Sequence, residues 1–408
     1  MNKMQRSPFA GIRVLDLTRV VASPFTSYQL GLLGAEVIKI EDPESRGDTM
    51  RYRRGSKPEY GEKGMATFYL SQSANKQSMS LNLRTKEGRE IFRALALEAD
   101  VLIENLRAGA MTAMGLGYDD LKEENPRLIY CSVTGFGQTG PKRRHGAYDP
   151  VIQAASGLMS VNGTAAAAPL RVGAPVMDYS AGLSAAFGVA TALFERSQSG
   201  LGQHIDVSML DTALVMMGAL VTEAATAKST PKPQGNRAPA ETYGNACFTC
   251  KDGILISIAA MEKHHRKRMW VAIDRPDIPL DPRFRTDDDC RINFQELHAE
   301  MDQAFLARTA QEWEEILNAA DVPAARVRSI PEALEMAQVQ ERGIMHTMNE
   351  VPGIKGTATF PLVPFKLSAG GATVISAPPL MGQHTDEILR SRGYDEVDII
   401  RLRSQGVV

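Results

Sequence analysis

An alternation of two hydrophobic periods near the start of the chain constrains the fold more than any other feature. Apolar residues dominate GIRVLDLT (11–18), which predicts a buried strand. SPFTSYQLGLLG (23–34) predicts a helix, with Ser23 as its cap and Pro24 in its first turn. AEVIKIE (35–41) predicts a second strand. This order indicates a β-α-β unit, and such units build parallel sheets.

Helices and strands continue to alternate through the first half of the chain. Further strands are predicted at 78–83, 100–105, 127–137 and 202–210. Further helices are predicted at 86–99, 179–197 and 211–226. The helix over 179–197 consists largely of small apolar residues, which indicates that much of its surface is buried. We therefore expect an α/β fold for this half.

Residues 227–241 are rich in proline, lysine and small polar residues and form the clearest linker in the sequence. After the linker, ACFTCKDGILISIA (246–259) predicts two strands joined by a hairpin at KDG. Helical stretches near 262–272 and 291–319 follow. These elements predict a separate, smaller α+β domain.

The charge balance excludes a nucleic-acid-binding protein. The 408 residues carry 46 Lys and Arg against 48 Asp and Glu, a net charge of −2, whereas nucleic-acid-binding domains are basic. Four cysteines are too few for a disulfide framework and are expected to be reduced. The N-terminus has no apolar run, and the most apolar stretch, 213–221, is shorter than the roughly 20 residues that span a membrane. We expect a soluble, cytoplasmic protein without a membrane partner.

GFGQTG (135–140) matches the glycine pattern of dinucleotide-binding domains, but the residues around it do not. That pattern requires a helix to begin at the glycines, so that its N-terminus faces the pyrophosphate. Here Pro141 is followed by KRRH (142–145), which has no apolar helical face. No acidic residue ends a second strand about 20 residues later. We expect a turn-rich loop after a strand.

Two other motifs have ordinary structural explanations. Cys247 and Cys250 form a single CxxC pair without the second pair or the histidines that a zinc site needs, so no metal is expected. The basic run at 263–268 is typical of a solvated helix face, and it could also attract a phosphorylated ligand. His264 and His265 are adjacent and do not share a helix face as a metal-binding pair would.

Asp178, in GAPVMDYSAG, precedes the predicted small-residue helix. An aspartate at this position is typical of a helix N-cap, because its carboxylate accepts hydrogen bonds from free backbone N–H groups. The same position can hold a carboxylate rigidly, and carboxylates act as nucleophiles in covalent catalysis. The residues alone leave both roles open.

Several segments occur in the order in which one family of enzymes has them. They lie at 11–51, 75–83, 99–121, 125–141, 148–157, 176–210 and 380–408. Together they resemble the class III CoA-transferases (CaiB/BaiF family), which include carnitine, bile-acid and formyl-CoA:oxalate CoA-transferases. Racemases of 2-methylacyl-CoA share the fold. No single segment is specific, but so many in one order are.

The resemblance implies a Rossmann-like large domain, built from 1–226 and 339–408. It implies a linker at 227–241 and an inserted small α+β domain at 242–338. It further implies an interlocked homodimer, in which the small domain of one subunit closes the CoA pocket on the large domain of the other. Coenzyme A or acyl-CoA is then a substrate, and no permanently bound cofactor is expected.

Asp178 occupies the position of the family's catalytic aspartate. The implied reaction moves CoA from an acyl-CoA donor to a short carboxylic or dicarboxylic acid. The Asp178 carboxylate attacks the thioester and forms a mixed anhydride and CoA thiolate, which then attacks the aspartyl carbonyl to give an aspartyl-CoA thioester. The acceptor carboxylate attacks this thioester, and CoA leaves on the new acid. Both intermediates stay activated, so the transfer needs no ATP but requires exclusion of water.

Tyr148 and Asp149 bear on the choice between transferase and racemase. The racemases resemble G-H-D here, with the histidine as the proton-transfer base, whereas this chain has Ala147 before Tyr148 and Asp149. A tyrosine hydroxyl, with an ordinary pKa of about 10, is a poor base for an α-proton at neutral pH. We expect a transferase in which Tyr148 and Asp149 line the pocket and orient Asp178. Glu262, where racemases carry a second acid, keeps a 2-methylacyl-CoA racemase as the alternative.

Six further residues match family positions around CoA or are candidates for its phosphates: Val20, Ala22, Lys76, Asn105, Leu106 and Arg107. The backbone of the first two faces the acyl-thioester, the lysine contacts the nucleotide end, and the asparagine-leucine turn holds adenine and pantetheine. Arg107 is a candidate because guanidinium pairs bidentately with phosphate. On the residues alone, Lys76 would be a surface lysine and Arg107 part of a surface ion pair.

The donor and acceptor acids depend on pocket shape, which these motifs do not encode. Val21 stands where the oxalate enzymes place a glutamine that moves over the active site, and this apolar replacement disfavours oxalate. A third interpretation is a CoA-binding protein without catalytic activity.

Overall fold

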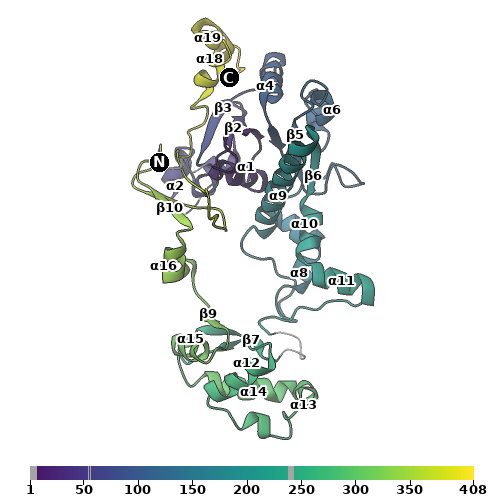
Figure 1. The fold of residues 1–408 in the computed structure, drawn as a ribbon, viewed down its shortest axis with the longest axis vertical. Helices are drawn as coiled ribbons and strands as arrows, with labels where there is room; N and C mark the ends of the chain where they lie inside the picture. Colours follow the sequence, from purple (N-terminus) through teal and green to yellow (C-terminus); the bar gives the residue numbers. More distant parts are fainter. Residues whose placement is uncertain (1–6, 54, 56, 238–242) are drawn as a thin grey trace. The chain divides into compact units, whose positions relative to one another are not determined.

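The computed structural model describes residues 7–53, 55, 57–237 and 243–408, and the chain divides into two compact units. The first unit consists of Met1–Ser156, Val172–Ala227 and Arg342–Val408, and the second of Gly157–Arg171 and Lys228–Glu341. Both units are therefore built from discontinuous segments, which the colours of Figure 1 show. The segment Gly157–Arg171, which the sequence placed in the large domain, packs within the second unit.

Six parallel strands form the sheet of the first unit. They are β1 (Arg13–Leu17), β2 (Glu36–Glu41), β3 (Lys76–Ser80), β4 (Val101–Glu104), β5 (Ile129–Thr134) and β6 (His204–Ser208). Their spatial order is β3-β2-β1-β4-β5-β6, and every neighbouring pair is parallel. This is the order of the doubly wound nucleotide-binding sheet. The α/β prediction is confirmed, although β3 begins two residues earlier than predicted.

The direction of winding changes between β1 and β4. β1 pairs with β2 on one side and with β4 on the other. The loops that leave the carboxyl ends of these two strands therefore diverge and leave a crevice between them. Doubly wound sheets bind their ligands in this crevice, so the loops that begin at Thr18 and Asn105 mark the expected site.

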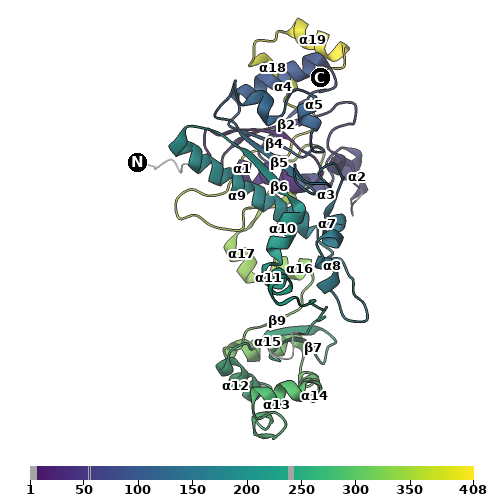
Figure 2. The same ribbon diagram turned by 90° about the vertical axis from the view of Figure 1, so that its right-hand side faces the viewer.

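Helices cover both faces of the sheet. The helices of the first unit are α1 (Ala22–Leu32), α2 (Pro58–Glu62), α3 (Thr67–Leu70), α4 (Lys86–Glu98), α5 (Ala110–Ala113), α6 (Tyr118–Leu121), α7 (Asp149–Ala155), α9 (Val176–Ser199), α10 (Met209–Met216), α11 (Gly218–Ala227), α18 (Thr385–Arg390) and α19 (Glu396–Ser404). A short antiparallel pair, β10 (Met345–Met348) and β11 (Ala358–Pro361), belongs to the same unit. In Figure 2, α4, α18 and α19 lie on one side of the strands and α1 and α9 on the other.

The two faces of this sheet differ in chemistry. Neighbouring residues of a strand point to opposite faces, so Leu15 packs under α4, α18 and α19 whereas Asp16 lies under α1. The first face is largely apolar, with the buried carboxyl of Glu104 and the hydroxyl of Ser132 as polar exceptions near its edge. The second carries buried charged residues from three strands: Asp16, Lys39 and Lys76. Buried charges of this kind must be paired, and their pairing determines where the loops above them lie.

The 24-residue helix α9 packs closely against α1. A Cβ atom added at Gly182 would lie 2.5 Å from the carbonyl oxygen of Ala22, so only glycine permits this approach. The helix was expected to be buried on much of its surface, but the chain buries one side only. Phe187 and Phe194 on the other side are 76% and 68% exposed. By length and composition α9 could cross a membrane, a test that core helices of soluble proteins also pass.

The predicted helix at 211–226 is two helices rather than one. α10 ends at Met216, α11 begins at Gly218, and the two axes differ in direction by 82°. A glycine at the junction is a common cause of such a break, because it weakens helix continuation. The sequence pattern missed this because both halves carry the same apolar residues.

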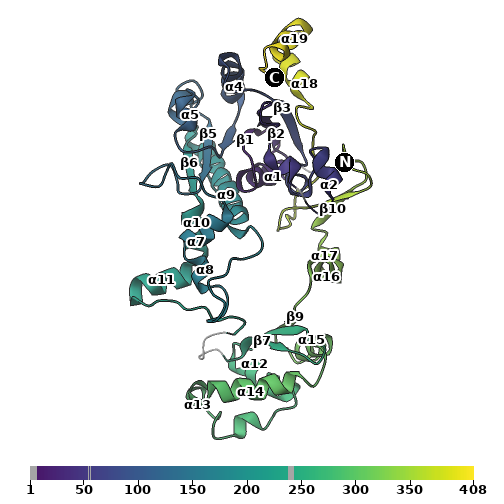
Figure 3. The same ribbon diagram turned by 180° about the vertical axis from the view of Figure 1, so that it is seen from behind.

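The second unit contains a three-stranded antiparallel sheet of order β7-β8-β9 covered by helices (Figure 3). Its elements are α8 (Leu158–Val161), β7 (Asn245–Thr249), β8 (Leu255–Ala259), α12 (Lys263–Ala272), α13 (Asp287–Ile292), α14 (Phe294–Phe305), α15 (Ala310–Ala319), β9 (Ala324–Arg326), α16 (Ile330–Glu335) and α17 (Ala337–Arg342). The predicted hairpin is confirmed, with Gly253 at a φ of 77°. The single stretch predicted at 291–319 is divided, because Thr309 and Glu312 form a capping box that starts a new helix.

Candidate active site

A cavity of about 180 Å³ lies at the carboxyl ends of β1, β4 and β5, where the sheet topology predicts a ligand. Its walls come from the loop after β1, the loop after β4, the segment before α7 and the first turn of α9. The lining residues named by the sequence are Val20, Ala22, Asn105, Leu106, Arg107, Tyr148 and Asp178. The structure therefore brings together seven residues from segments that are far apart in the chain. Asp149 lies directly behind this wall, whereas Lys76 is elsewhere.

Asp178 is a buried carboxylate without a partner. It is the third residue of α9 and is 8% exposed, and it accepts no hydrogen bond from any residue that the structure describes. Burial and the nearby charge of Asp149 raise its pKa to about 7. The residue at the N-cap position is Pro175, so the interpretation of Asp178 as an N-cap is wrong. A poorly solvated carboxylate without a cation is a reactive one.

Asp149 holds the start of α9 in place. One of its oxygens, Oδ2, accepts the backbone N–H of Met177 at 2.7 Å, and Oδ1 accepts Gln153 Nε2 at 2.5 Å. Asp149 is buried at the first position of α7. It therefore fixes the residue immediately before Asp178 and raises the pKa of Asp178 through its charge. Asp149 thus contacts the backbone next to Asp178, and its orienting role stays a prediction.

Tyr148 precedes α7 at its N-cap position and is 64% exposed, although it lines the cavity. Its hydroxyl makes no hydrogen bond within the described residues. It is therefore placed to contact a ligand from the open side rather than to hold Asp178. His145 lines the same side, and sequence reasoning did not select it individually.

The side-chain amide of Asn105 forms two hydrogen bonds with the backbone of the loop after β1. Its Oδ1 accepts the backbone N–H of Arg19 at 3.0 Å, and its Nδ2 donates to the carbonyl of Arg19 at 2.7 Å. The next residue, Val20, has a φ of 76°. The side chain of Asn105 thus connects the two loops that flank the crevice, a contact that spacing in the sequence does not reveal.

Ser23 was expected to cap the first helix, and this expectation is wrong. The helix begins at Ala22, with Val21 at the N-cap position and no capping hydrogen bond from a side chain. Ser23 is fully buried and lies among the residues that line the cavity, and its Oγ has no hydrogen-bond partner in the described chain. Unpaired buried hydroxyls are uncommon and call for an explanation. Sequence reasoning missed this residue because a serine before a helix usually caps it.

Lys76 does not line the cavity and is not on the surface. Its ammonium group donates to Asp16 Oδ2 at 3.0 Å, to the carbonyl of Pro24 at 2.8 Å and to Ser27 Oγ at 2.8 Å. These three bonds use all three of its hydrogens. Burial, only partly offset by the charge of Asp16, lowers its pKa to about 8. The structure therefore gives Lys76 a place beneath α1 rather than beside a nucleotide.

Three arginines line the cavity and make its mouth positive: Arg19, Arg107 and Arg143. None of them forms an ion pair with another described residue. Of these three, the sequence selected only Arg107 individually. Unpaired guanidinium groups around a cavity attract anions, and phosphate in particular.

The other motifs lie apart from this cavity or do not match a cofactor. No helix begins between the glycines of GFGQTG and α7 in the described chain, and the backbone N–H of Gln138 donates to the carboxylate of Asp206. A carboxylate at that point repels phosphate. Cys247 lies in β7 and Cys250 directly after it, and the described residues contain no metal-binding group of three or more His, Cys, Asp or Glu. Glu262 is an exposed residue of the second unit, before α12.

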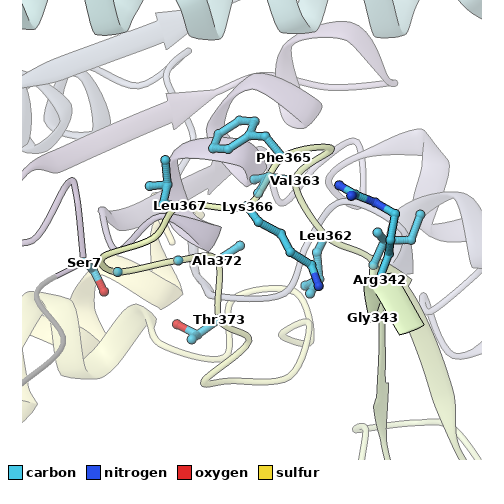
Figure 4. Close-up of a pocket in the computed structure, with 13 residues that line it drawn as sticks. Ser7, Arg342, Gly343, Leu362, Val363, Phe365, Lys366, Leu367, Ala372 and Thr373 are labelled. Atoms are coloured by element: carbon cyan, nitrogen blue, oxygen red, sulfur yellow. The ribbon is translucent and has the colours of Figure 1, made fainter. Parts of the chain in front are cut away.

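A second cavity, of about 380 Å³, lies between the loop at 362–373 and the segment at 342–344 (Figure 4). Arg342 and Lys366 contribute positive charge to it, and Leu362 and Phe365 apolar surface. The described residues that line it include no carboxylate, imidazole or thiol. It is larger than the cavity at Asp178, but no carboxylate lines it among the described residues.

Curated proteins of similar sequence match most of the length of the chain. It is 32% identical over 402 residues to succinyl-CoA:glutarate CoA-transferase from Homo sapiens, covering 98% of this chain and 90% of the relative. It is 36% identical over 342 residues to acetyl-CoA:oxalate CoA-transferase from Acetobacter aceti, covering 83% and 86%. It is 31% identical over 389 residues to succinyl-CoA:mesaconate CoA-transferase from Haloarcula marismortui, covering 94% and 96%.

Solved structures of similar fold agree with these relatives. A CaiB/BaiF family protein from Brucella suis superposes with a TM-score of 0.82 at 29% identity, covering 95% of this chain and 100% of that chain. A hypothetical protein from Mycobacterium tuberculosis superposes with a TM-score of 0.81 at 29% identity, covering 94% and 99%. The family model for CoA-transferase family III matches residues 9–385 of the chain. The chain therefore belongs to CoA-transferase family III and is an enzyme of that class.

Proposed function

We propose that the protein transfers CoA from an acyl-CoA donor to a short carboxylic acid, with Asp178 as the nucleophile. The observation that carries this proposal is the buried, unpaired carboxylate of Asp178 in the cavity at the switch point of the sheet. An anionic oxygen without hydrogen bonds or a cation has little solvation to lose when it attacks a carbonyl. The fold and the family relationship support CoA transfer as the overall reaction.

The proposed steps conserve the activated acyl bond. The Asp178 carboxylate attacks the donor thioester, the C–S bond breaks, and a mixed anhydride and CoA thiolate result. The thiolate attacks the aspartyl carbonyl and releases the donor acid, leaving an aspartyl-CoA thioester. The acceptor carboxylate displaces CoA thiolate to form a second anhydride, and the thiolate then attacks the acceptor's acyl carbon. The products are the new acyl-CoA and the free Asp178 carboxylate.

Residues around the cavity suit the parts of CoA. We assign the phosphates to the unpaired guanidinium groups of Arg107, Arg19 and Arg143, which line the opening. Asn105 and Leu106 form the turn against which pantetheine would lie, and the backbone at Val20 and Ala22 would face the thioester. We do not assign Lys76 to CoA, because its hydrogens are already used by Asp16, Pro24 and Ser27.

We propose short dicarboxylic acids as the substrate class. Three relatives are named for succinyl-CoA with glutarate, succinyl-CoA with mesaconate, and acetyl-CoA with oxalate. The apolar Val21 lines the cavity and cannot hydrogen-bond a second carboxylate close to the reacting one. This favours acids with a longer spacing between carboxylates than oxalate has.

We propose that the enzyme is a homodimer of interlocked chains. The side of α9 and α10 that faces away from the sheet presents large apolar side chains to solvent in the single chain: Phe187, Phe194, Val215 and Met216. Exposed apolar residues gathered on adjacent helices are typical of a surface that another chain covers. Sedimentation at concentrations from nanomolar to micromolar would test this.

The decisive experiment traps the covalent intermediates. The enzyme is mixed with succinyl-CoA and glutarate and quenched with hydroxylamine, which converts an aspartyl anhydride or thioester to a hydroxamate. Peptide mass spectrometry should find the hydroxamate at Asp178, and Asp178→Asn should lose transfer activity by about 10⁴-fold. Asp211→Asn, which changes an exposed first-turn aspartate of α10, is the matched control. An unmodified Asp178 in an active enzyme, or full activity of Asp178→Asn, would contradict the proposal.

A 2-methylacyl-CoA racemase is the second candidate, and the position of His145 favours it. His145 lines the cavity that contains Asp178, so an imidazole and a carboxylate are available to exchange a proton at C2. Deuterium incorporation at C2 of 2-methylacyl-CoA in heavy water, without any acceptor acid, would support this reaction. If no deuterium is incorporated by enzyme that transfers CoA normally, the racemase reaction is excluded.

A further inference from the structure

In the loop after β1, side chains form hydrogen bonds with the backbone N–H and carbonyl of both Arg19 and Val20. Asn105 binds both the N–H and the carbonyl of Arg19. The N–H of Val20 donates to Asp48 Oδ1 at 3.1 Å, and the carbonyl of Val20 accepts Gln72 Nε2 at 2.7 Å. Backbone N–H and carbonyl groups of surface loops usually bind water. This loop is unusually constrained, because protein side chains bind these groups instead.

Val20 occupies a backbone conformation that its side chain disfavours. Its φ of 76° lies in the left-handed region, where a β-branched residue is a genuine outlier. Such a conformation persists only where the surrounding structure imposes it, and it is concentrated at functional sites. Asp48 accepts a hydrogen bond from the N–H of Val20, and Gln72 donates one to its carbonyl.

Asp48 and Gln72 are themselves buried, and Asp48 Oδ1 also accepts the backbone N–H of Met50 at 3.0 Å. Asp48 Oδ2 lies 3.3 Å from the ammonium of Lys39, and Lys39 also donates to the carbonyl of Thr18 at 2.6 Å. The side chain of Gln72 makes one hydrogen bond, to the carbonyl of Val20, while its Oε1 has no partner in the described chain. A buried amide with half of its capacity unused is costly, so its single bond has a specific structural purpose.

The loop leads directly into the start of α1, which faces Asp178. Val21, Ala22 and Ser23 follow Val20 without a break, and all three line the cavity. Neither Asp48 nor Gln72 lines it. We propose that Asp48 and Gln72 are positioning residues, which hold Val20 in the left-handed conformation and thereby place the start of α1 at the reacting carbonyl. This inference rests on the proposed CoA transfer at Asp178.

The test substitutes Gln72, because its side chain is uncharged and the one hydrogen bond of that side chain is to the loop. Gln72→Met keeps the size and removes the donor. We expect kcat for CoA transfer to fall by about 10- to 100-fold, since small misplacements of reacting groups cost this much, while KM for acyl-CoA changes less than about threefold. The matched control is Gln29→Met, which alters a buried glutamine of α1 whose Nε2 has no partner in the described chain. This control should stay within about twofold of the wild type.

A second substitution separates positioning from a general loss of stability. Glycine adopts positive φ without strain, so adding Val20→Gly to Gln72→Met should recover at least about fivefold in kcat. A purely structural role for Gln72 predicts lower stability in urea and no recovery of kcat. Gln72→Leu, which cannot donate to the Val20 carbonyl, provides the same test if the methionine variant fails to fold.

The outcomes distinguish this inference from the proposed function. If wild-type enzyme forms the Asp178 hydroxamate and Gln72→Met keeps wild-type kcat, the positioning role is wrong and the transfer mechanism stands. If Gln72→Met loses kcat and the glycine substitution does not restore it, the positioning role is also wrong. If wild-type enzyme transfers CoA without any modification of Asp178, both proposals fail.

Discussion

Two groups of buried acids in the first unit differ in their partners. Beneath α1, three carboxylates each pair with a buried cation: Asp16 with Lys76 at 3.0 Å, Glu41 with Arg51 at 2.5 Å and Asp48 with Lys39 at 3.3 Å. In the cavity, Asp178 is nearly as buried but has neither a cation nor a hydrogen bond among the described residues. Its charged neighbour is another acid, Asp149.

The pKa values of these acids are shifted in opposite directions. Burial disfavours ionisation of Asp16, yet the charges of Lys76 and Lys39 hold the pKa of Asp16 below its usual range. For Asp178, burial and a like charge act together and raise the pKa to about 7. Burial alone therefore does not identify a catalytic carboxylate. Burial without a cation or a hydrogen bond is the feature that makes Asp178 the candidate, because such a charge is costly to keep.

The largest expected effect is that Asp16→Asn and Asp178→Asn change the free energy of unfolding in opposite directions. Asp16→Asn leaves Lys76 as a partly uncompensated buried charge and should lower the free energy of unfolding by about 3 to 5 kcal/mol. Asp178→Asn removes a charge that folding disfavours and should raise it at pH 8 by about 2 kcal/mol. Urea unfolding of both variants against the wild type measures the two values.

The pH dependence checks this assignment. The pKa of Asp178 is raised on folding, so the folded protein binds more protons than the unfolded chain between about pH 4 and 7, and wild-type stability falls as pH rises through that range. The advantage of Asp178→Asn should therefore vanish below about pH 4 and be complete above pH 7. An advantage that is equal at all pH values would show that the carboxylate is not the cause.

A smaller effect is expected when the like charge beside Asp178 is removed. Asp178 must be ionised to attack, so kcat/KM should fall as the pH drops through about 7. Asp149→Asn keeps an oxygen for the N–H of Met177 but removes the negative charge. The acidic limb should move to lower pH by about 0.5 to 1 unit. A pH–rate profile with an unmoved limb would contradict the electrostatic coupling.

The smallest expected effect concerns the unpaired hydroxyl of Ser23. Ser23→Ala removes a buried polar group without a partner and should raise the free energy of unfolding by about 1 kcal/mol. If the hydroxyl donates to an oxygen of the reacting acyl group, kcat should fall several-fold in the same variant. Stability and activity are measured on one preparation of Ser23→Ala. If the hydroxyl contacts the acyl group, stability rises while kcat falls; if its role is only structural, the two change in the same direction.

The strands and helices of the first unit are predicted well from the sequence, because their hydrophobic pattern depends only on residues close together in the chain. The β-α-β alternation at 11–41 depends on spacing between neighbours, and the parallel sheet confirms it. The rejection of a helix at GFGQTG rests on residues that directly follow the motif. Asp178 was selected through the family resemblance, since the residues alone allowed a cap as readily as a nucleophile.

The features that sequence missed depend on contacts between distant residues. Lys76 is interpreted as a surface lysine until the fold shows that it reaches Asp16, which lies 60 residues away. The role of Asn105 toward Arg19 spans 86 residues. The break between α10 and α11 depends on one glycine within an uninterrupted apolar run. None of these can be read from periodicity, because each is decided by packing.

The close approach of α1 and α9 at Gly182 has a consequence for variation in this enzyme. Asp178 lies one turn before Gly182 on one helix, and Ala22 begins the other, so a single missing methyl group sets the width of the reaction centre. New substrates can be accommodated by changing side chains such as Val21 or Tyr148, which border the opening. Any side chain at position 182 would instead push α1 away from α9 and so separate Ala22 from Asp178, whichever substrate is bound.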